Sequence, residues 1–331
     1  MSKTGLHAPA DVSGMIKEGR VLLLAGDEAL LSKLPAGNWI AGTSVNFIAE
    51  NGGAMDRDRI FVTDLAAHAA SAVVRKYDAK TLPGIGADYP ANGFTVIIVP
   101  GMSEIHTTFA KDVQNYQGVF NSPLIGWISG VHLSEIGKRA PKCFAGNGAP
   151  LANEAVAMHV TLPKGQGAHI DIVNLFKQGD GESIVFDADG FACAGKCRIQ
   201  GKSANLATYI ADRKIDTKLP LVANYHGAMI NVSIQSCDPE KGTVAFYAPV
   251  FKGIEYKFAA PLGDYAKTFK QGVGHVKAGD IAFSCNCILN YAYADLEGKK
   301  TGSFVGPITF GEVAYMLLNQ TLVYLSIDKN A

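Results

Sequence analysis

The sequence has no long hydrophobic run and no excess of charge of either sign. Its most apolar segments, residues 20–26 and 95–100, are far shorter than the ~20 residues that a membrane-spanning helix needs, so we interpret both as buried strands. The 30 Lys and Arg residues equal the 30 Asp and Glu residues in number, which leaves no global field to attract nucleic acid or an anionic membrane. We therefore expect no nucleic acid and no membrane as partners. Zero net charge also means that repulsion does not prevent a homo-oligomer from forming.

The sequence also lacks an export signal and a disulfide scaffold. Its first nine residues contain no apolar core, so we expect no signal peptide. Six cysteines among 331 residues are too few for a disulfide scaffold, and a chain with 48% hydrophobic residues can bury a large core without one. We expect a cytoplasmic protein with reduced thiols.

Several well-known enzyme motifs are absent as well. The sequence contains no Gly-x-Ser-x-Gly elbow, no His-Glu-x-x-His helix and no phosphate-binding P-loop, and its closest approaches to Gly-x-Gly-x-x-Gly, at 84–86, 146–148 and 165–167, each lack the third glycine. These absences weigh against an enzyme. They leave the question open, because a Cys or Ser nucleophile with a distant His leaves no fixed spacing in a sequence.

Short β-type runs alternate with helical patterns through the first half of the chain. Strands are predicted at 20–26, 60–63, 95–99 and 123–128, with Asp27 as the N-cap of a short helix. A helix from Ser103 is predicted by Ile105, Phe109 and Val113, which recur at a spacing of four residues. The fold class that follows is α/β (mixed α+β), with two consecutive αβ-layered halves and mixed sheets. The turn-rich residues 187–190 place the boundary between domains 1–185 and 186–331.

The second half shows a similar alternation of helices and strands. Helices are predicted at 203–214 and from Asp264, and strands at 219–225, 231–236, 243–247, 254–258, from 281, and at 321–327. Thr309 and Glu312 fit a capping box, in which each side chain satisfies a free backbone N–H at a helix start. A helix through Val313, Met316 and Leu317 is therefore predicted.

Four stretches of the sequence resemble patterns of the FIST family of sensory domains. Residues 123–136 resemble the N-terminal FIST pattern, in which a strand ends at a Gly and a small polar residue before a turn of the Gly-Glu-Ile type. Residues 283–285, 306–313 and 318–323 resemble the C-terminal pattern of a Ser-Cys strand end, an aromatic-Gly-Glu segment and an Asn-x-Thr-Leu strand, in that order. The basic residue that often follows the Ser-Cys pair in the family is missing here, where Asn286 and Cys287 follow.

The resemblance implies a function as well as a fold. It implies a FIST-N-like domain over 1–185 and a FIST-C-like domain over 186–331, in a stand-alone intracellular sensor without an output module. Such a protein binds a small metabolite and takes part in signal transduction through a separate partner protein. No cofactor is required, although haem is the ligand of some members.

The predicted ligand site lies where strands end. In open α/β sheets, ligands bind in the crevice outside the carboxyl ends of the strands. The turn after the strand at 123–128 carries several polar side chains, and turns in the second half supply more. The predicted ligand-binding residues are Gly126, Ser129, His132, Glu135, Tyr225, His226, Gly311 and Glu312. The alternatives are a structural loop with an incidental His132 and a solvent-facing turn at His226.

The alternative function is a hydrolase. Its nucleophile would be Cys285 or Ser129, and its base would be His132 or His226. His226 could instead act as a haem ligand. Replacement of one nucleophile would abolish the activity of such an enzyme without changing its fold.

Four smaller features each have two interpretations. Residues 42–44 precede an expected helix, so they either hold an anion at its N-terminus or only cap it. Cys285 and Cys287 face one side of a strand, which suits a buried core, or they join Cys193 and Cys197 as a metal site of unusual spacing. Residues 290–293 supply two tyrosines that form a pocket wall or ordinary packing. His106 is expected to be structural.

Overall fold

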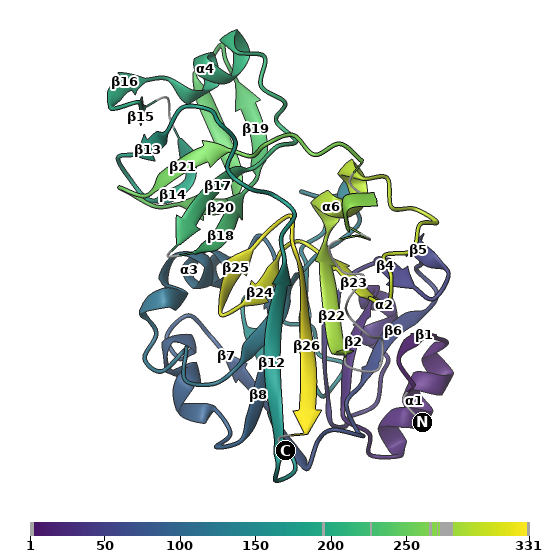
Figure 1. Ribbon diagram of the computed structural model, residues 1–331. Helices are drawn as coiled ribbons and strands as arrows, with labels where there is room; N and C mark the ends of the chain where they lie inside the picture. The colour runs from purple at the N-terminus through teal and green to yellow at the C-terminus, as the bar shows by residue number, and fades with distance from the viewer. Residues whose placement is uncertain are drawn as a thin grey trace. The chain divides into compact units, whose positions relative to one another are not determined.

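The computed structural model describes residues 3–193, 196–225, 227–264, 267–269, 271 and 281–329, and within them the chain is a mixed α/β protein (Figure 1). The expected fold class, with several mixed sheets, is confirmed. The chain divides into two compact units. Unit 1 comprises Met1–Val173, Lys270–Leu317 and Leu322–Ala331, and unit 2 comprises Asn174–Phe269 and Leu318–Thr321. Across the described ranges, no helix is long and apolar enough to cross a membrane.

The first sheet of unit 1 has the strand order β1-β6-β2-β3-β10 and contains one parallel pair, β2 with β3. The short helix α2 (Glu28–Leu31) connects these two strands, and Asp27 caps it by accepting a hydrogen bond from the Ala29 N–H, as predicted. Helix α1 (Pro9–Lys17) packs its buried face on the same core as β2 and β3. The strands are β1 (Gly5–His7), β2 (Leu22–Gly26), β3 (Trp39–Thr43), β6 (Ile60–Asp64) and β10 (Cys143–Ala145).

The second sheet of unit 1 has the order β25-β24-β9-β8-β11-β7, and its parallel pair is β8 with β9. Helix α3 (Glu104–Asp112) connects these two strands. Ser103 caps it, and Ile105 and Phe109 are buried, which confirms the predicted helix. The strands are β7 (Ser71–Tyr77), β8 (Gly93–Pro100), β9 (Leu124–Ser129), β11 (Ala155–Thr161), β24 (Glu312–Ala314) and β25 (Met316–Leu318), and two 3-10 helices, η1 (Leu82–Asp88) and η2 (Val113–Asn115), lie between them in sequence.

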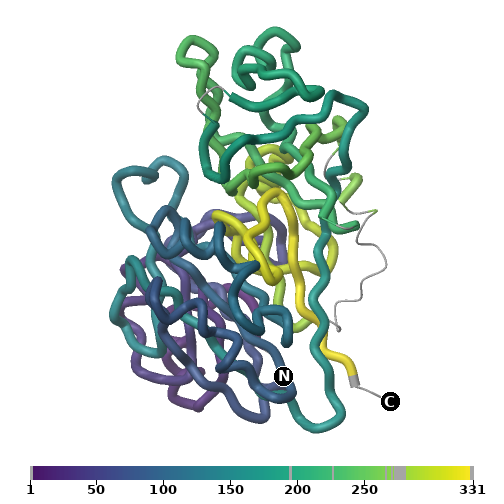
Figure 2. The backbone as a smooth tube through the Cα atoms, turned by 90° about the vertical axis from the view of Figure 1, so that its left-hand side faces the viewer, coloured from purple at the N-terminus to yellow at the C-terminus, as the bar shows by residue number. Residues whose placement is uncertain are grey.

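The third sheet joins strands from the N-terminal part, the middle and the C-terminal part of the chain. Its order is β12-β26-β22-β23-β4-β5, and β12 and β26 run side by side over their whole lengths (Figures 1 and 2). Helix α6 (Ile288–Tyr293) follows β22 directly. The strands are β4 (Asn46–Ala49), β5 (Gly52–Met55), β12 (Gln166–Val173), β22 (Ile281–Cys287), β23 (Gly306–Thr309) and β26 (Leu322–Lys329).

In its described residues, unit 2 contains two antiparallel sheets and helix α4 (Leu206–Asp212) around its own core. Phe186 packs edge-on against both Phe246 and Tyr256 at the centre of that core. The sheet orders are β16-β15-β13-β21-β17-β18 and β14-β20-β19. The strands are β13 (Ile184–Phe186), β14 (Gly190–Cys193), β15 (Cys197–Ile199), β16 (Lys202–Ala204), β17 (Leu221–Tyr225), β18 (Ala228–Val232), β19 (Ile234–Asp238), β20 (Thr243–Val250) and β21 (Glu255–Phe258).

The division into units differs from the predicted boundary between 1–185 and 186–331. Unit 2 begins at Asn174 and is inserted within unit 1, because the C-terminal strands β22 to β26 return to complete the sheets of unit 1. The turn at 187–190, taken as a boundary, connects β13 and β14 inside unit 2. A local turn signal cannot show that β26 pairs with β12, which lies about 150 residues earlier in the sequence.

The helix predicted after the Thr309–Glu312 capping box is wrong. Thr309 ends β23, Glu312 begins β24, and Met316 begins β25. The two side chains of the expected box do meet, since the Thr309 hydroxyl donates to Glu312 Oε1 at 3.1 Å, but both residues are buried in strands. Pairing of β24 with β9 supplies the backbone partners that a helix would have supplied. The helix expected from Asp264 falls largely outside the described residues.

Candidate functional site

The loops that follow β2, β3 and β9 meet in unit 1, at the carboxyl ends of its parallel strand pairs. The Gly130 N–H donates to the Thr43 carbonyl at 2.8 Å and so ties the loop after β9 to the end of β3. Ser129, the last residue of β9, is fully buried, and its hydroxyl lies 3.8 Å from the Cys143 sulfur. The void between these loops is only about 10 Å³, which is space for a single water molecule.

Four charged side chains cross-link these loops. Arg57 and Arg139 each contact Asp27 Oδ2, at 3.1 and 3.2 Å, and both also reach Glu135, at 3.2 and 3.3 Å. Burial acts to raise the pKa of Asp27, but hydrogen bonds from Arg139 and from the Ala29 N–H, together with both arginine charges, outweigh it, so the pKa is lowered. The hydrogen bond from Arg57 lowers the pKa of Glu135 in the same way. These four residues, called the Asp27 network below, hold the loop 130–139 against β2 and β3.

A cleft of about 370 Å³ is lined in part by His132 and Leu133 of the same loop. This volume falls in the range of small-molecule sites in proteins. Two apolar side chains are unusually exposed in it, Met55 at 49% and Leu133 at 44%. Helix α6 and the segment after it supply Tyr291, Asp295 and Glu297 to the opposite wall. The cleft is lined by Asn46, Met55, His132, Leu133, Ile288, Tyr291, Ala292, Asp295 and Glu297.

The polar groups of the cleft are held in defined states. His132 Nδ1 accepts a hydrogen bond from the Ser134 N–H at 3.3 Å, so a neutral His132 carries its hydrogen on Nε2 and can donate there. The Tyr291 hydroxyl donates to Glu297 Oε2. Burial, and then this carboxylate, raise the pKa of Tyr291 above its ordinary value. The cleft thus offers a nitrogen donor at His132, carboxylate acceptors and apolar surface.

The predicted ligand-binding residues lie in three places. Only His132 lines the cleft, while Glu135 belongs to the Asp27 network and Ser129 is buried beside it. Tyr225 lies in unit 2, where its hydroxyl is 3.5 Å from that of Tyr256 and burial raises its pKa. His226 lies outside the described residues.

Gly126, Gly311 and Glu312 come together, but inside the second sheet rather than at the cleft. Gly311 accepts the Ile128 N–H at 2.8 Å, and Glu312 is fully buried opposite Trp127. A Cβ atom on Gly126 would lie 1.7 Å from the Ile97 carbonyl oxygen, so this glycine is required by the close approach of β8. These residues therefore have a structural role.

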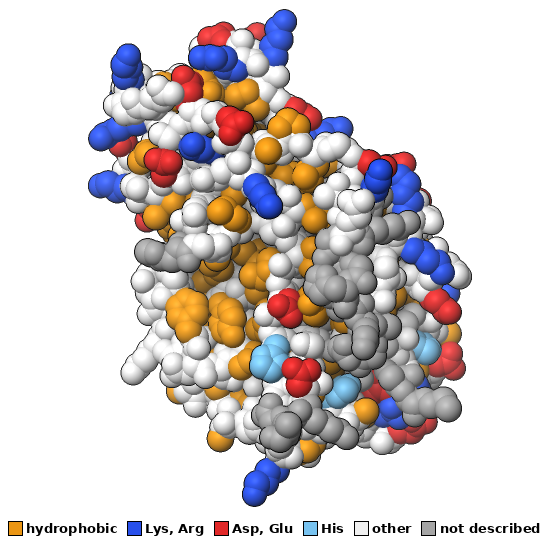
Figure 3. Space-filling view, viewed as in Figure 1, with side chains coloured by type: hydrophobic (Ala, Val, Ile, Leu, Met, Phe, Trp, Pro, Cys, Tyr) orange, Lys and Arg blue, Asp and Glu red, His pale blue; other side chains and the backbone are white. Residues whose placement is uncertain are grey.

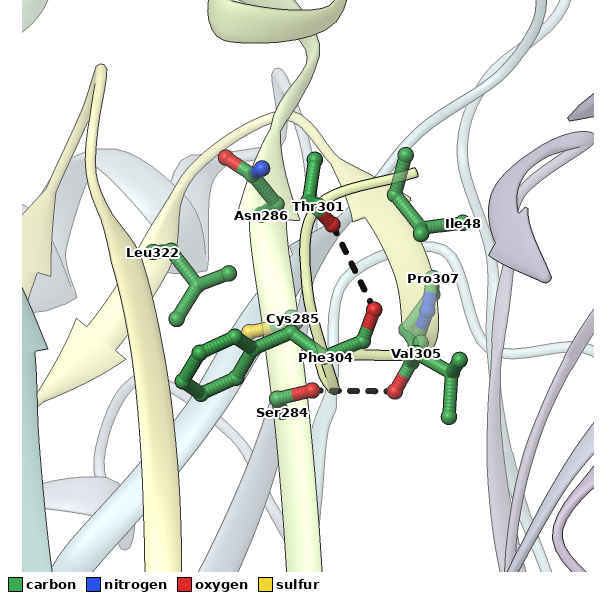
Figure 4. A pocket seen from close by; sticks show the side chains of 10 residues that line it. Ile48, Ser284, Cys285, Asn286, Thr301, Phe304, Val305, Pro307 and Leu322 are labelled. Carbon is green, nitrogen blue, oxygen red and sulfur yellow. Dashed lines mark hydrogen bonds between the residues drawn. The ribbon is translucent and has the colours of Figure 1, made fainter. Parts of the chain in front are cut away.

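The candidate nucleophiles are placed unfavourably for catalysis. Burial raises the pKa of the Cys285 thiol well above its ordinary value, and Sγ donates to the Gly126 carbonyl at 3.4 Å. The void beside Cys285 measures about 10 Å³, and the Ser284 hydroxyl next to it donates to the Val305 carbonyl at 2.9 Å (Figure 4). Neither Cys285 nor Ser129 hydrogen-bonds a histidine among the described residues. A thiolate or activated serine is not favoured at these positions.

The remaining sequence hypotheses can also be placed. No group of three or more His, Cys, Asp or Glu side chains that could hold a metal occurs in the described part of the chain. Cys193 and Cys197 lie in β14 and β15 of unit 2, whereas Cys285 and Cys287 lie in β22 of unit 1. Residues 42–44 are followed by strand β4, so the expected helix N-terminus is wrong. Burial lowers the pKa of His106 to about 4, and its Nδ1 accepts the Met102 N–H, in keeping with a structural role.

Sequence reasoning missed most of the cleft. Met55 and Glu297 are far from His132 in the sequence and belong to no motif, and Arg57 and Arg139 gave no local sign that they face Asp27. Tyr291 was singled out as a candidate pocket wall, and it does line the cleft.

A protein-family model matches nearly the whole sequence. The model of DUF6976, a family of unknown function, matches residues 7–328. The matched stretch includes every residue that lines the cleft and every member of the Asp27 network. No curated protein matches the sequence.

Proposed function

The chain belongs to DUF6976, and we propose from the geometry of unit 1 that it is a small-ligand-binding sensory protein whose site is the cleft beside His132. The observation that carries the proposal is the combination in one 370 Å³ cleft of exposed apolar side chains with a few fixed polar groups. Ligand sites in proteins have this composition, because apolar contact supplies affinity and a few polar groups set orientation.

Binding without catalysis is the better interpretation of the same residues. The side chains considered as nucleophiles, Cys285 and Ser129, are buried away from the cleft lining. The resemblance to the FIST family supports a sensory role, with a metabolite as ligand, a cytoplasmic location and a separate signalling partner. Basic and acidic side chains are interspersed on the coloured surface in Figure 3, which supports neither a nucleic-acid partner nor an anionic membrane. We propose no required cofactor.

The first test is native mass spectrometry and absorption spectroscopy of the purified protein. A stoichiometric small adduct is the expected result. A Soret band would instead select haem as the ligand and overturn the proposal that no cofactor is needed.

The second test fills the cleft. Ala292 is exposed on α6 and lines the cleft, so Ala292→Trp should occupy it without disturbing the core. The matched control is Ala10→Trp, at an exposed position of α1 in the same unit. The adduct should be lost in Ala292→Trp and retained in Ala10→Trp. Equal retention by both variants would show that the ligand binds elsewhere.

A further inference from the structure

We propose that the ligand of this cleft is an organic cation, an amine or guanidine attached to an apolar body. This inference rests on the proposed function and specifies the chemistry of its ligand. It starts from the charges of the cleft. Among the described residues that line the cleft, two are carboxylates, Asp295 and Glu297, and none is a lysine or arginine.

Glu297 is the carboxylate to which the cation would bind. Its Oε2 accepts the Tyr291 hydroxyl, and no described cationic side chain lies within ion-pair distance of it. The nearby Lys299 is instead 3.4 Å from Asp295, whose side chain is 87% exposed. The tyrosine therefore orients Glu297 but does not neutralise it, and its second oxygen can accept a hydrogen bond from a ligand. A charge-assisted hydrogen bond of this kind is among the stronger polar contacts that proteins make.

The rest of the lining determines the remainder of the ligand. Met55, Leu133 and Ile288 provide apolar surface, and methionine adapts its shape to flat or branched groups. The Nε2–H of His132 can donate to an acceptor on the ligand. A small molecule with a positive nitrogen, an aromatic or aliphatic body and one acceptor satisfies all of these groups. An anion would meet Glu297 with no described cation in the lining to compensate.

The experiment compares three probes of nearly equal shape by isothermal titration calorimetry with the full chain. Phenethylamine carries the positive charge, 2-phenylethanol is the neutral analogue, and 3-phenylpropionate is the anionic one. Phenethylamine should bind most tightly, and its affinity should fall as sodium chloride rises from 50 to 500 mM, because salt screens partly exposed charges. Over this range of salt concentration the Debye length shortens by roughly threefold.

The residue-level test is Glu297→Gln, with Glu240→Gln as the control at an exposed position of unit 2. Glutamine can still accept the Tyr291 hydroxyl, so the fold should be kept while the charge is lost. Phenethylamine affinity should fall about tenfold or more in Glu297→Gln, in line with the loss of one charge-assisted hydrogen bond, and stay unchanged in Glu240→Gln.

The outcomes separate this inference from the function on which it rests. Equal or tighter binding of the neutral or anionic probe would overturn the cationic class and leave a ligand-binding cleft. Failure of phenethylamine to bind at millimolar concentration would also overturn it, whereas a co-purifying molecule that Ala292→Trp displaces would still support the proposed function. If phenethylamine does not bind and no co-purifying molecule is displaced by Ala292→Trp, the proposed function itself is overturned.

Discussion

Asp27 allows the most direct test of the network behind the cleft, because it has two roles that can be separated. Its Oδ1 caps α2, and its carboxylate faces Arg57 and Arg139. Asparagine caps helices as well as aspartate does. Asp27→Asn therefore removes the charge and keeps the cap, whereas Asp27→Ala removes both.

The expected loss of unfolding free energy follows from how exposed Asp27 and its two arginine partners are. The Asp27 side chain is 11% exposed, whereas the side chains of Arg57 and Arg139 are 36% and 34% exposed. Exposed ion pairs contribute about 0–1 kcal/mol each, and breaking a fully buried one costs about 3–5 kcal/mol. Because both arginines keep access to water, we expect Asp27→Asn to cost about 1–2 kcal/mol of unfolding free energy. Loss of the cap adds about 1 kcal/mol, so Asp27→Ala should cost about 2–3 kcal/mol.

Tryptophan fluorescence during urea unfolding is the suitable assay. The chain has 2 tryptophans, Trp39 and Trp127, and both lie in unit 1, so the signal reports the unit that contains the network. Asp58→Asn, at an exposed position, is the control and should leave the midpoint unchanged. If Asp27→Asn had the wild-type midpoint, the charge would contribute nothing and the reasoning would be refuted. Equal losses for Asn and Ala would refute the capping role.

The pH dependence gives an independent check. The pKa values of Asp27 and Glu135 are lowered in the folded protein, so the unfolded chain binds protons more readily than the folded one does. The stability that these groups contribute is present above their unfolded pKa values of about 4, and it is lost as the pH falls through the lower folded values. The difference in unfolding free energy between wild type and Asp27→Asn should therefore shrink in strong acid.

Three further predictions concern unit 1. Glu135→Gln should weaken phenethylamine binding a few-fold by calorimetry while leaving a folded protein, because it loosens the loop that carries His132; unchanged affinity would show that the network does not position the cleft. Burial lowers the pKa of His159 to about 4, so this neutral side chain stabilises the fold above pH ~6.5 and loses that contribution on acidification. From pH 7 to 5, wild type should lose about 2 kcal/mol more than His159→Gln, as measured by urea unfolding, and parallel losses would contradict this. Gly126→Ala should cost about 3 kcal/mol or more, because its Cβ has no space, whereas Gly14→Ala in α1 should stabilise by about 0.5–1 kcal/mol; the two urea midpoints should move in opposite directions.

Elements with strong local signals could be predicted from the sequence. The α3 helix combines a cap at Ser103 with a four-residue spacing of buried residues, and both signals are local. The β2 strand and the Asp27 cap of α2, which follows it directly, are similar cases. The capping box at Thr309 was equally clear but misleading, since the same two side chains can also pair when they lie on consecutive strands of two different sheets. The pairing of β24 with β9 outweighed the local preference of this segment for a helix.

The units and the cleft depend on contacts that a single sequence does not reveal. The insertion of unit 2 follows from the pairing of β12 with β26, which no local pattern encodes. The cleft has the same origin, because Met55, His132 and Glu297 come from three distant parts of unit 1. His132 could be predicted because it follows a buried strand at its carboxyl end, where ligand sites commonly occur. No comparable rule points to Met55 or Glu297.

The position of His132 explains why the strand-end rule succeeded only in part. The crevice at the ends of β2, β3 and β9 is filled by the Asp27 network and leaves a void of about 10 Å³, too small for a metabolite. The network fixes Glu135, and three residues earlier in the same loop His132 faces the cleft of about 370 Å³. The strand ends thus hold the loop that carries His132, but they do not themselves line the cleft. Charges at the crevice position the loop, and the loop presents His132 and Leu133 to the cleft.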